Sequence, residues 1–157
     1  MIDSNLNITK YANKQDKDTA MGFLSNVDWG AAKYLAKKIQ KDQLKEDEKI
    51  IFLIDRKAQL IGFSSLLIVD IISNVNYGPF LSTVYVEPIY RGQGVAYQLV
   101  NEIEDIAKAA DYADLYAITQ HTGLYEKMDF EFLFTDTDDM DRPVRVLHKK
   151  LYPTHLV

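Results

Sequence analysis

The stretch that decides the fold is residues 81–96, which read LSTVYVEPIYRGQGVA. Its first six residues are typical of a strand, and Pro88 ends the pairing because it has no N–H group. A glycine-containing loop that begins with Arg91 follows and leads directly into an apolar helical pattern. This arrangement favours the binding of a diphosphate, because it combines free N–H groups at a helix start, glycines that allow close approach and a fixed guanidinium. The stretch therefore predicts a strand, a phosphate-binding loop and a helix.

Two familiar nucleotide motifs do not fit this loop. The dinucleotide fingerprint needs a third small residue where the chain has Tyr97, and an acidic residue at the end of the next strand, which closes with residues 118–120, ITQ. The P-loop needs a Lys and a Ser or Thr after its last glycine, and neither is present. Gly92 and Gly94 by themselves are also typical of a tight turn before a helix, so that alternative stays open.

The segments on both sides of this stretch predict a mixed α/β domain. Strand patterns lie at 7–11, 50–54, 60–68, 80–86, 113–119, 130–134 and 144–150, and helical patterns at 16–27, 29–43, 95–110 and 123–128. We expect residues 49–69 to form a hairpin and the last two strands to pair across the acidic loop 135–141. The order predicts a largely antiparallel sheet with one strand–helix–strand crossover. No linker or repeat divides the chain, so we expect a single domain over 1–157.

Composition limits the classes of function. With 157 residues and 47% hydrophobic residues, the chain suits one compact core, and a net charge of -5 disfavours nucleic acid as a partner. No apolar run approaches the roughly 20 residues of a membrane-spanning helix, and residues 1–5 lack the features of a signal peptide. The absence of cysteine excludes disulfides and thiolate metal sites. We expect a cytoplasmic protein that needs no metal and binds no membrane.

Two motifs resemble those of a known family. Residues 91–96, RGQGVA, resemble the acetyl-CoA motif R/Q-x-x-G-x-G/A of the GNAT superfamily of N-acetyltransferases, and residues 86–88, VEP, stand where that family has V-x-P. Residues 124–130, LYEKMDF, resemble its second signature, L-Y-E-K-x-G-F. The resemblance implies a GNAT-like fold, with helices flanking a mostly antiparallel central sheet and a splayed strand before the loop. It also implies transfer of an acetyl group from acetyl-CoA to a primary amine, by direct attack in a ternary complex.

The resemblance assigns roles to individual residues. Backbone groups of the strand are expected to contact the pantetheine arm of CoA, and the loop with the first helical residue to hold the diphosphate. These cofactor-binding residues are Val84, Tyr85, Val86, Arg91, Gly92, Gln93, Gly94, Val95, Ala96 and Tyr97. Tyr97 is equally compatible with an ordinary exposed aromatic residue. Tyr125, the tyrosine of the second signature, is expected to be the general acid that stabilises or protonates the departing thiolate.

A general base is not assigned by the sequence. Glu87 ends the central strand, where a carboxylate can face an acceptor, but it also suits a solvated turn. His121 lies four residues before Tyr125 and is of a type that titrates near neutral pH, but a surface histidine explains it as well. Asp70 interrupts an apolar run, where it either lines an acceptor site or ends its strand.

Three positions depart from expected patterns. Ile118 stands where many family members have a cofactor-contacting asparagine, which puts that contact in doubt. Asp129 replaces the glycine of the second signature, and aspartate tolerates a positive φ better than most residues. A calcium-binding loop that began at Asp136 in the acidic loop would need a glutamate at its twelfth position, where the chain has Leu147. The acidic loop is therefore expected to be a solvated hairpin tip.

Other functions stay open at this level. A non-catalytic acyl-CoA-binding or regulatory module would share the phosphate loop and differ on the acceptor side. The acceptor itself, either a small-molecule amine or a protein N-terminus, is not identified, and a homodimer is a family-level expectation only.

Overall fold

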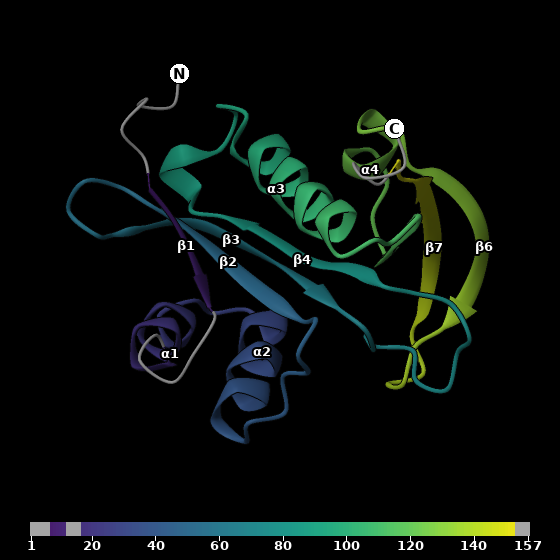
Figure 1. Cartoon of the computed structure of the whole chain (residues 1–157), viewed down its shortest axis with the longest axis horizontal. Coiled ribbons are helices and arrows are strands. Elements are labelled where there is room, and N and C mark those ends of the chain that lie inside the picture. Colours follow the sequence, from purple (N-terminus) through teal and green to yellow (C-terminus); the bar gives the residue numbers. More distant parts are fainter. Residues whose placement is uncertain (1–6, 12–16, 153–157) are drawn as a thin grey trace. The chain divides into compact units, whose positions relative to one another are not determined.

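The computed structural model describes residues 7–11 and 17–152, so the N-terminal residues 1–5 discussed above lie outside the described residues. Figure 1 shows the helices and strands along the chain. Their bounds are β1 Asn7–Tyr11, α1 Lys17–Ser25, α2 Gly30–Gln40, β2 Lys49–Ile54, β3 Leu60–Leu67, β4 Phe80–Val86, a 3-10 turn Pro88–Tyr90, α3 Val95–Ala109, β5 Asp114–Thr119, α4 Leu124–Lys127, β6 Glu131–Thr137 and β7 Pro143–Lys150.

The chain divides into two compact units. Unit 1 comprises residues 1–65 and 83–99, and unit 2 comprises residues 66–82 and 100–157. The elements β3, β4 and α3 each contribute residues to both units.

Unit 1 contains the strands β1, β2, β3 and β4 in that order and the helices α1 and α2, which lie side by side in Figure 1. β1 and β2 are antiparallel, and Asp55 N–H to Gln59 carbonyl, 3.0 Å, closes the turn between β2 and β3. α2 buries Ala32, Leu35 and Ile39, the face that the helical spacing predicts. The predicted hairpin and the predicted helix are both confirmed.

Helix α2 ends three residues earlier than its apolar pattern predicts. Asp42 has a φ of 51°, in the left-handed region where a helix cannot continue. The N–H groups of Asp42 and Gln43 instead bond the carbonyls of Ile39 and Lys38, at 3.1 and 2.8 Å. These bonds satisfy carbonyls that the helix end would leave free.

Unit 2 contains the strand order β4, β5, β7, β6. β7 is antiparallel to both β5 and β6, and its side chains Val144, Val146 and Leu147 are buried. β4 and β5 are parallel, and among the described residues their register consists of one pair, Phe80 with Tyr116. That short register is compatible with the splay expected of β4.

Two local features differ from the sequence prediction. A 3-10 turn at Pro88–Tyr90 precedes the glycine loop, where only a loop was expected. β6 extends to Thr137, so the first three residues of the predicted loop 135–141 pair with β7 as strand. The pairing of Thr135 with Arg145 and of Asp136 with Val144 outweighs the low strand propensity of aspartate. The fold class itself, mixed α/β with a mostly antiparallel sheet, is confirmed.

Candidate functional site

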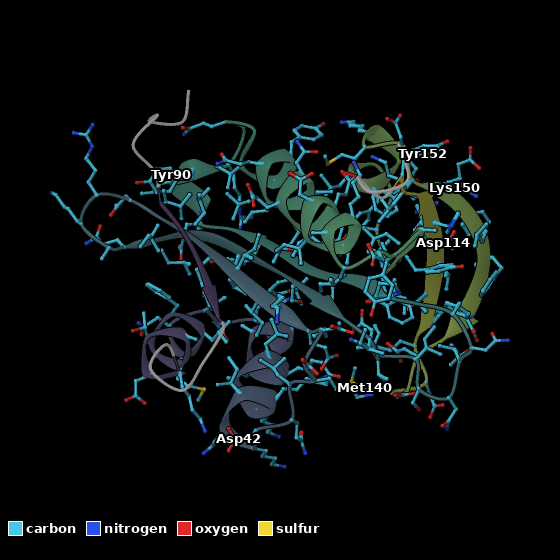
Figure 2. The ribbon with its side chains drawn as sticks, viewed as in Figure 1. Asp42, Tyr90, Asp114, Met140, Lys150 and Tyr152 are labelled. Carbon is cyan, nitrogen blue, oxygen red and sulfur yellow. The ribbon has the colours of Figure 1, made fainter. Side chains whose placement is uncertain are left out.

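The phosphate-loop residues lie in unit 1, between the end of β4 and the start of α3. The 3-10 turn begins at Pro88 and closes with a bond from Tyr90 N–H to the Glu87 carbonyl, 2.9 Å. Tyr90 is labelled in Figure 2 and marks this turn. Because proline has a fixed φ and no N–H, it suits the first position of the turn and ends the pairing of β4.

The two glycines adopt a backbone conformation that other residues rarely adopt. Gly92 has a φ of 79° and Gly94 a φ of 83°, and a Cβ built on either one meets no atom within 4 Å. The glycines are therefore required by backbone conformation, and the space above them is open. An oxygen-rich group can approach the main chain there, as a diphosphate must.

Helix α3 presents its free N–H groups at the same loop. Its first intrahelical bond runs from Gln98 N–H to the Gly94 carbonyl, 3.1 Å, so the N–H groups that precede it in the first turn have no helical acceptor. Val95 is buried and anchors the helix start, whereas Gly92 and Gly94 are exposed. The positive end of the helix dipole adds to the attraction for an anion. These features fit the diphosphate of CoA.

Arg91 is the charged residue of the loop formed by residues 91–97. Its Nε donates to the Val86 carbonyl at 2.9 Å, and its guanidinium carbon lies 5.9 Å from the centre of the Tyr85 ring. Tyr97 in the first turn of α3 is 40% exposed. The predicted binding role of Tyr97 therefore stays a prediction, since exposure suits both of its interpretations.

Strand β4 contains an irregularity that the sequence did not reveal. Thr83 has a φ of 60°, and its carbonyl accepts a bond from Ser64 Oγ at 2.7 Å while its hydroxyl lies 3.1 Å from Ser65 Oγ. These two serines of β3 stabilise the irregular residue directly before Val84, Tyr85 and Val86. A pattern of two serines inside an apolar strand was the only sequence signal.

Close packing of β3 against β4 depends on Gly62. A Cβ at this position would lie 2.4 Å from the Tyr85 carbonyl oxygen, a distance that no side chain tolerates. The pairing continues to Glu87, whose N–H bonds the Ile61 carbonyl at 2.7 Å. The backbone at Tyr85 is therefore fixed by its neighbouring strand.

The Glu87 carboxylate acts electrostatically on the Tyr85 hydroxyl. Burial raises the pKa of Tyr85, and the charge of Glu87 raises it further, while Arg91 opposes the shift. The role of Glu87 as a base stays a prediction.

The predicted acid, Tyr125, lies in unit 2 at the first turn of α4. Its side chain is 9% exposed and packs edge-on against Phe130, with ring centres 5.6 Å apart. Burial raises the pKa of Tyr125 above its ordinary value, and the negative charge of Asp70 raises it further. Tyr125 therefore keeps its proton at neutral pH, as a hydrogen-bond donor must.

Asp70 is one of the few buried carboxylates of unit 2. It is 6% exposed, and Ser82 Oγ donates to its Oδ1 at 3.2 Å. The sequence left open whether Asp70 ends a strand or lines a site; the structure places it beyond the end of β3, where its charge acts on Tyr125. The contribution of Ser82 was not predicted.

His121 is exposed, and the contacts described for it involve its main chain. Its N–H bonds Thr119 Oγ1 at 3.0 Å, and its carbonyl accepts a bond from Arg145 at 2.9 Å. Arg145 also pairs with Glu126 at 3.0 Å, and this hydrogen bond lowers the pKa of Glu126. The segment before α4 is thereby held in place, and a catalytic role for His121 stays a prediction.

A half-buried lysine, which the sequence did not predict, secures the end of α4. Lys149 Nζ lies 2.5 Å from a Glu104 carboxylate oxygen and donates to the Met128 carbonyl at 2.9 Å. Asp129, which replaces the glycine of the second signature, has a φ of 70°. The positive φ anticipated for this position is present, and aspartate adopts it.

Ile118 packs against a buried cluster that includes Ile72 and Val146, so its side chain supports the core of unit 2. An apolar side chain has no amide, so the contact expected of an asparagine at this position is absent from Ile118.

The acidic hairpin is organised by its own hydrogen bonds. Asp138 is buried and accepts bonds from the N–H groups of Met140 and Arg142, each at 2.9 Å, and from the Arg142 guanidinium at 2.8 Å. Within the described residues, no group of three or more histidine or carboxylate side chains is placed to hold a metal ion. Over the same residues, no helix is both long and apolar enough to cross a bilayer.

Comparisons with known proteins place the chain in a family. A model described as the acetyltransferase (GNAT) family matches residues 16–130, which is more than half of the chain. No curated protein sequence gave a match.

Solved structures share the fold at low identity. An aminoglycoside 6'-N-acetyltransferase in complex with coenzyme A is 17% identical, with a TM-score of 0.66, over 94% of this chain and 98% of that one. A spermidine N-acetyltransferase variant from Vibrio cholerae is 15% identical, with a TM-score of 0.63, over 94% and 95%. An acetyltransferase from Streptococcus agalactiae is 19% identical, with a TM-score of 0.66, over 95% and 100%. The match to the family model, together with this shared fold, shows that the chain belongs to the GNAT acetyltransferase family.

Proposed function

We propose that this protein is an N-acetyltransferase that transfers an acetyl group from acetyl-CoA to a primary amine. The observation that carries the proposal is the loop of residues 91–97. It combines two glycines at positive φ with open space above them, the free N–H groups of a helix start and an arginine. This combination suits a diphosphate, and the family to which the chain belongs uses acetyl-CoA.

In this proposal, β4 and the loop bind different parts of acetyl-CoA. We assign the main chain of Val84, Tyr85 and Val86 to the pantetheine arm, and Arg91 together with residues 92–97 to the diphosphate. Acetyl-CoA supplies an activated acyl group as a thioester. A side-chain substitution in β4 that preserves the strand should therefore weaken CoA binding less than one that changes the glycines.

The proposed chemistry needs one bond formed and one broken. The amine nitrogen bonds the acetyl carbon, the carbon–sulfur bond breaks, the nitrogen loses a proton and the sulfur ends as a thiol. Tyr125 is the proposed hydrogen-bond donor to the sulfur, because its raised pKa keeps the phenol protonated where a free thiol, with a pKa of about 8.5, begins to ionise. Glu87 and His121 remain candidates for the group that accepts the amine proton.

The chemical class of the acceptor is inferred from the similar structures and from the net charge. Two of the similar structures are named for spermidine and for aminoglycosides, both of which are amines. The net charge of -5 also favours a cationic acceptor to a small extent. We also propose a single-domain organisation over 1–157, a cytoplasmic location and a homodimer.

A thiol-release assay tests the proposal. Purified protein is incubated with acetyl-CoA and a library of polyamines, aminoglycosides, amino acids and peptides with free N-termini, and free CoA thiol is measured. We expect release only when acetyl-CoA and a matching amine are both present, and mass spectrometry should find the acceptor heavier by one acetyl group. Tight CoA binding with no acetylation of any acceptor would contradict the proposal and favour a non-catalytic acyl-CoA-binding module.

A further inference from the structure

We propose that Tyr85 is a positioning residue, whose ring holds the Arg91 guanidinium ready for the diphosphate of CoA. The inference rests on the proposed function, because it concerns how the loop binds CoA. It adds a side-chain role at a position where the expected contact with the cofactor is made by the main chain alone.

Arg91 is exposed, yet two contacts restrict its side chain. Nε donates to the Val86 carbonyl at 2.9 Å, and the guanidinium carbon lies 5.9 Å from the centre of the Tyr85 ring. A guanidinium at this distance from an aromatic ring is attracted by the ring face. Since Nε carries one of the five N–H donors of arginine, donors on the terminal nitrogens stay available for phosphate oxygens.

Tyr85 is itself held on several sides within unit 1. Its ring stacks on Phe63, with centres 5.3 Å apart and planes at 25°, and lies 5.9 Å from the ring of Trp29. Phe63 is fully buried, so it provides a fixed surface. Gly62 allows β3 to approach the Tyr85 main chain closely.

The value of this arrangement is preorganisation. A free surface arginine has many rotamers, and ordering it on binding costs conformational entropy. A side chain already held near its bound position avoids part of that cost, and the gain appears as affinity. The gain is confined to ligands that carry phosphates, because Arg91 has no other assigned contact with the ligand.

Calorimetric titration of CoA and of pantetheine, which lacks the phosphates, tests the inference. In Tyr85→Leu we expect CoA to bind about three- to tenfold more weakly than in the wild type, and pantetheine to change by less than about twofold. Tyr85→Phe keeps the ring and loses the hydroxyl, so it should recover most of the CoA affinity. Tyr152→Leu is the matched control, because Tyr152 is 72% exposed in unit 2 and has no assigned role.

A double-mutant cycle with Arg91→Ala separates positioning from packing. If Tyr85 acts through Arg91, the CoA affinity of the double variant should equal that of Arg91→Ala alone. Equal CoA affinity in wild type and Tyr85→Leu, or an equal loss for CoA and pantetheine, would overturn the inference.

A failure of the proposed function gives a different result, because the wild type would then bind no CoA. That result would overturn both the proposed function and the inference about Tyr85. The melting temperature of each variant is measured first. If Tyr85→Leu does not fold, Tyr85→Met, which also removes the ring, is compared in the wild-type and Arg91→Ala backgrounds: additive losses would contradict positioning.

Discussion

Residues 91–97 and the surroundings of Tyr125 are built in opposite ways. The loop offers exposed main-chain N–H groups whose geometry depends on Gly92 and Gly94, whereas Tyr125 is a buried side chain whose proton affinity depends on burial and on Asp70. A binding site made of main chain should respond mainly to changes of backbone conformation. A reacting group made of one side chain should respond to the loss of a single atom.

The largest expected effect is therefore on turnover, in Tyr125→Phe. Loss of one oxygen should lower kcat by about 100- to 10,000-fold, the range typical of a positioned proton donor. The affinity for CoA, measured by calorimetry, should stay within about twofold, because binding is assigned to the loop. Tyr152→Phe is the control and should keep full activity. Undiminished turnover of Tyr125→Phe between about pH 6 and 10 would remove Tyr125 from the mechanism.

The next effect concerns the loop, in Gly94→Val. A β-branched residue at a φ of 83° costs about 1–3 kcal/mol, so either the loop shifts or the fold weakens. We expect CoA affinity to fall by about 5- to 100-fold, measured by calorimetry on protein that is still folded.

Gly22→Ala is the matched glycine control for this variant. Gly22 lies inside α1, and an added Cβ meets no atom within 4 Å. The substitution should raise the free energy of unfolding by about 0.5–1 kcal/mol and leave CoA binding unchanged. If Gly94→Val binds CoA as well as Gly22→Ala does, the conformation of the loop is not what binds the phosphates.

A smaller effect is expected on stability at alkaline pH. The folded pKa of Tyr125 is raised, so above about pH 10 the unfolded chain loses this proton while the folded protein keeps it. The contribution of this group to the free energy of unfolding is therefore fully present below about pH 10. Above that pH the contribution declines, by at most about 1.4 kcal/mol per pH unit. Urea unfolding at about pH 8 and pH 11 should show a smaller decline for Tyr125→Phe than for wild type. Equal declines would mean that Tyr125 is not buried as described.

The smallest expected effect is at Asp129. Its φ of 70° costs about 1–2 kcal/mol for most residues, less for aspartate, and glycine removes this cost while adding entropy to the unfolded chain. Asp129→Gly should therefore raise the free energy of unfolding by less than about 1 kcal/mol, and turnover should stay within about twofold. A loss of stability in urea unfolding would show that the aspartate makes a contact that compensates for its conformation.

The same contrast explains what the sequence could predict. The loop was predictable because glycine, proline and helix periodicity are local signals, and β4 has the bounds predicted for it, Phe80–Val86. Tyr125 was identified through a motif, but its environment was not predictable. Asp70 and Ser82 lie 55 and 43 residues before Tyr125 in the sequence. Only the tertiary structure places Ser82 where it hydrogen-bonds Asp70, and Asp70 where its charge raises the pKa of Tyr125.

Other features escaped prediction for the same reason. The irregular Thr83 is stabilised by two serines of β3, and the pair of Lys149 with Glu104 joins β7 to α3. Both depend on strand neighbours and helix packing that no local pattern specifies. The extension of β6 into the acidic segment likewise reflects pairing with β7, which outweighs local propensity.

A crystal structure of the wild-type protein with CoA tests the central claim most directly. We predict that the diphosphate lies against the N–H groups of residues 92–97 with the Arg91 guanidinium on its oxygens. CoA bound elsewhere on the molecule, with this loop free of phosphate, would contradict the account.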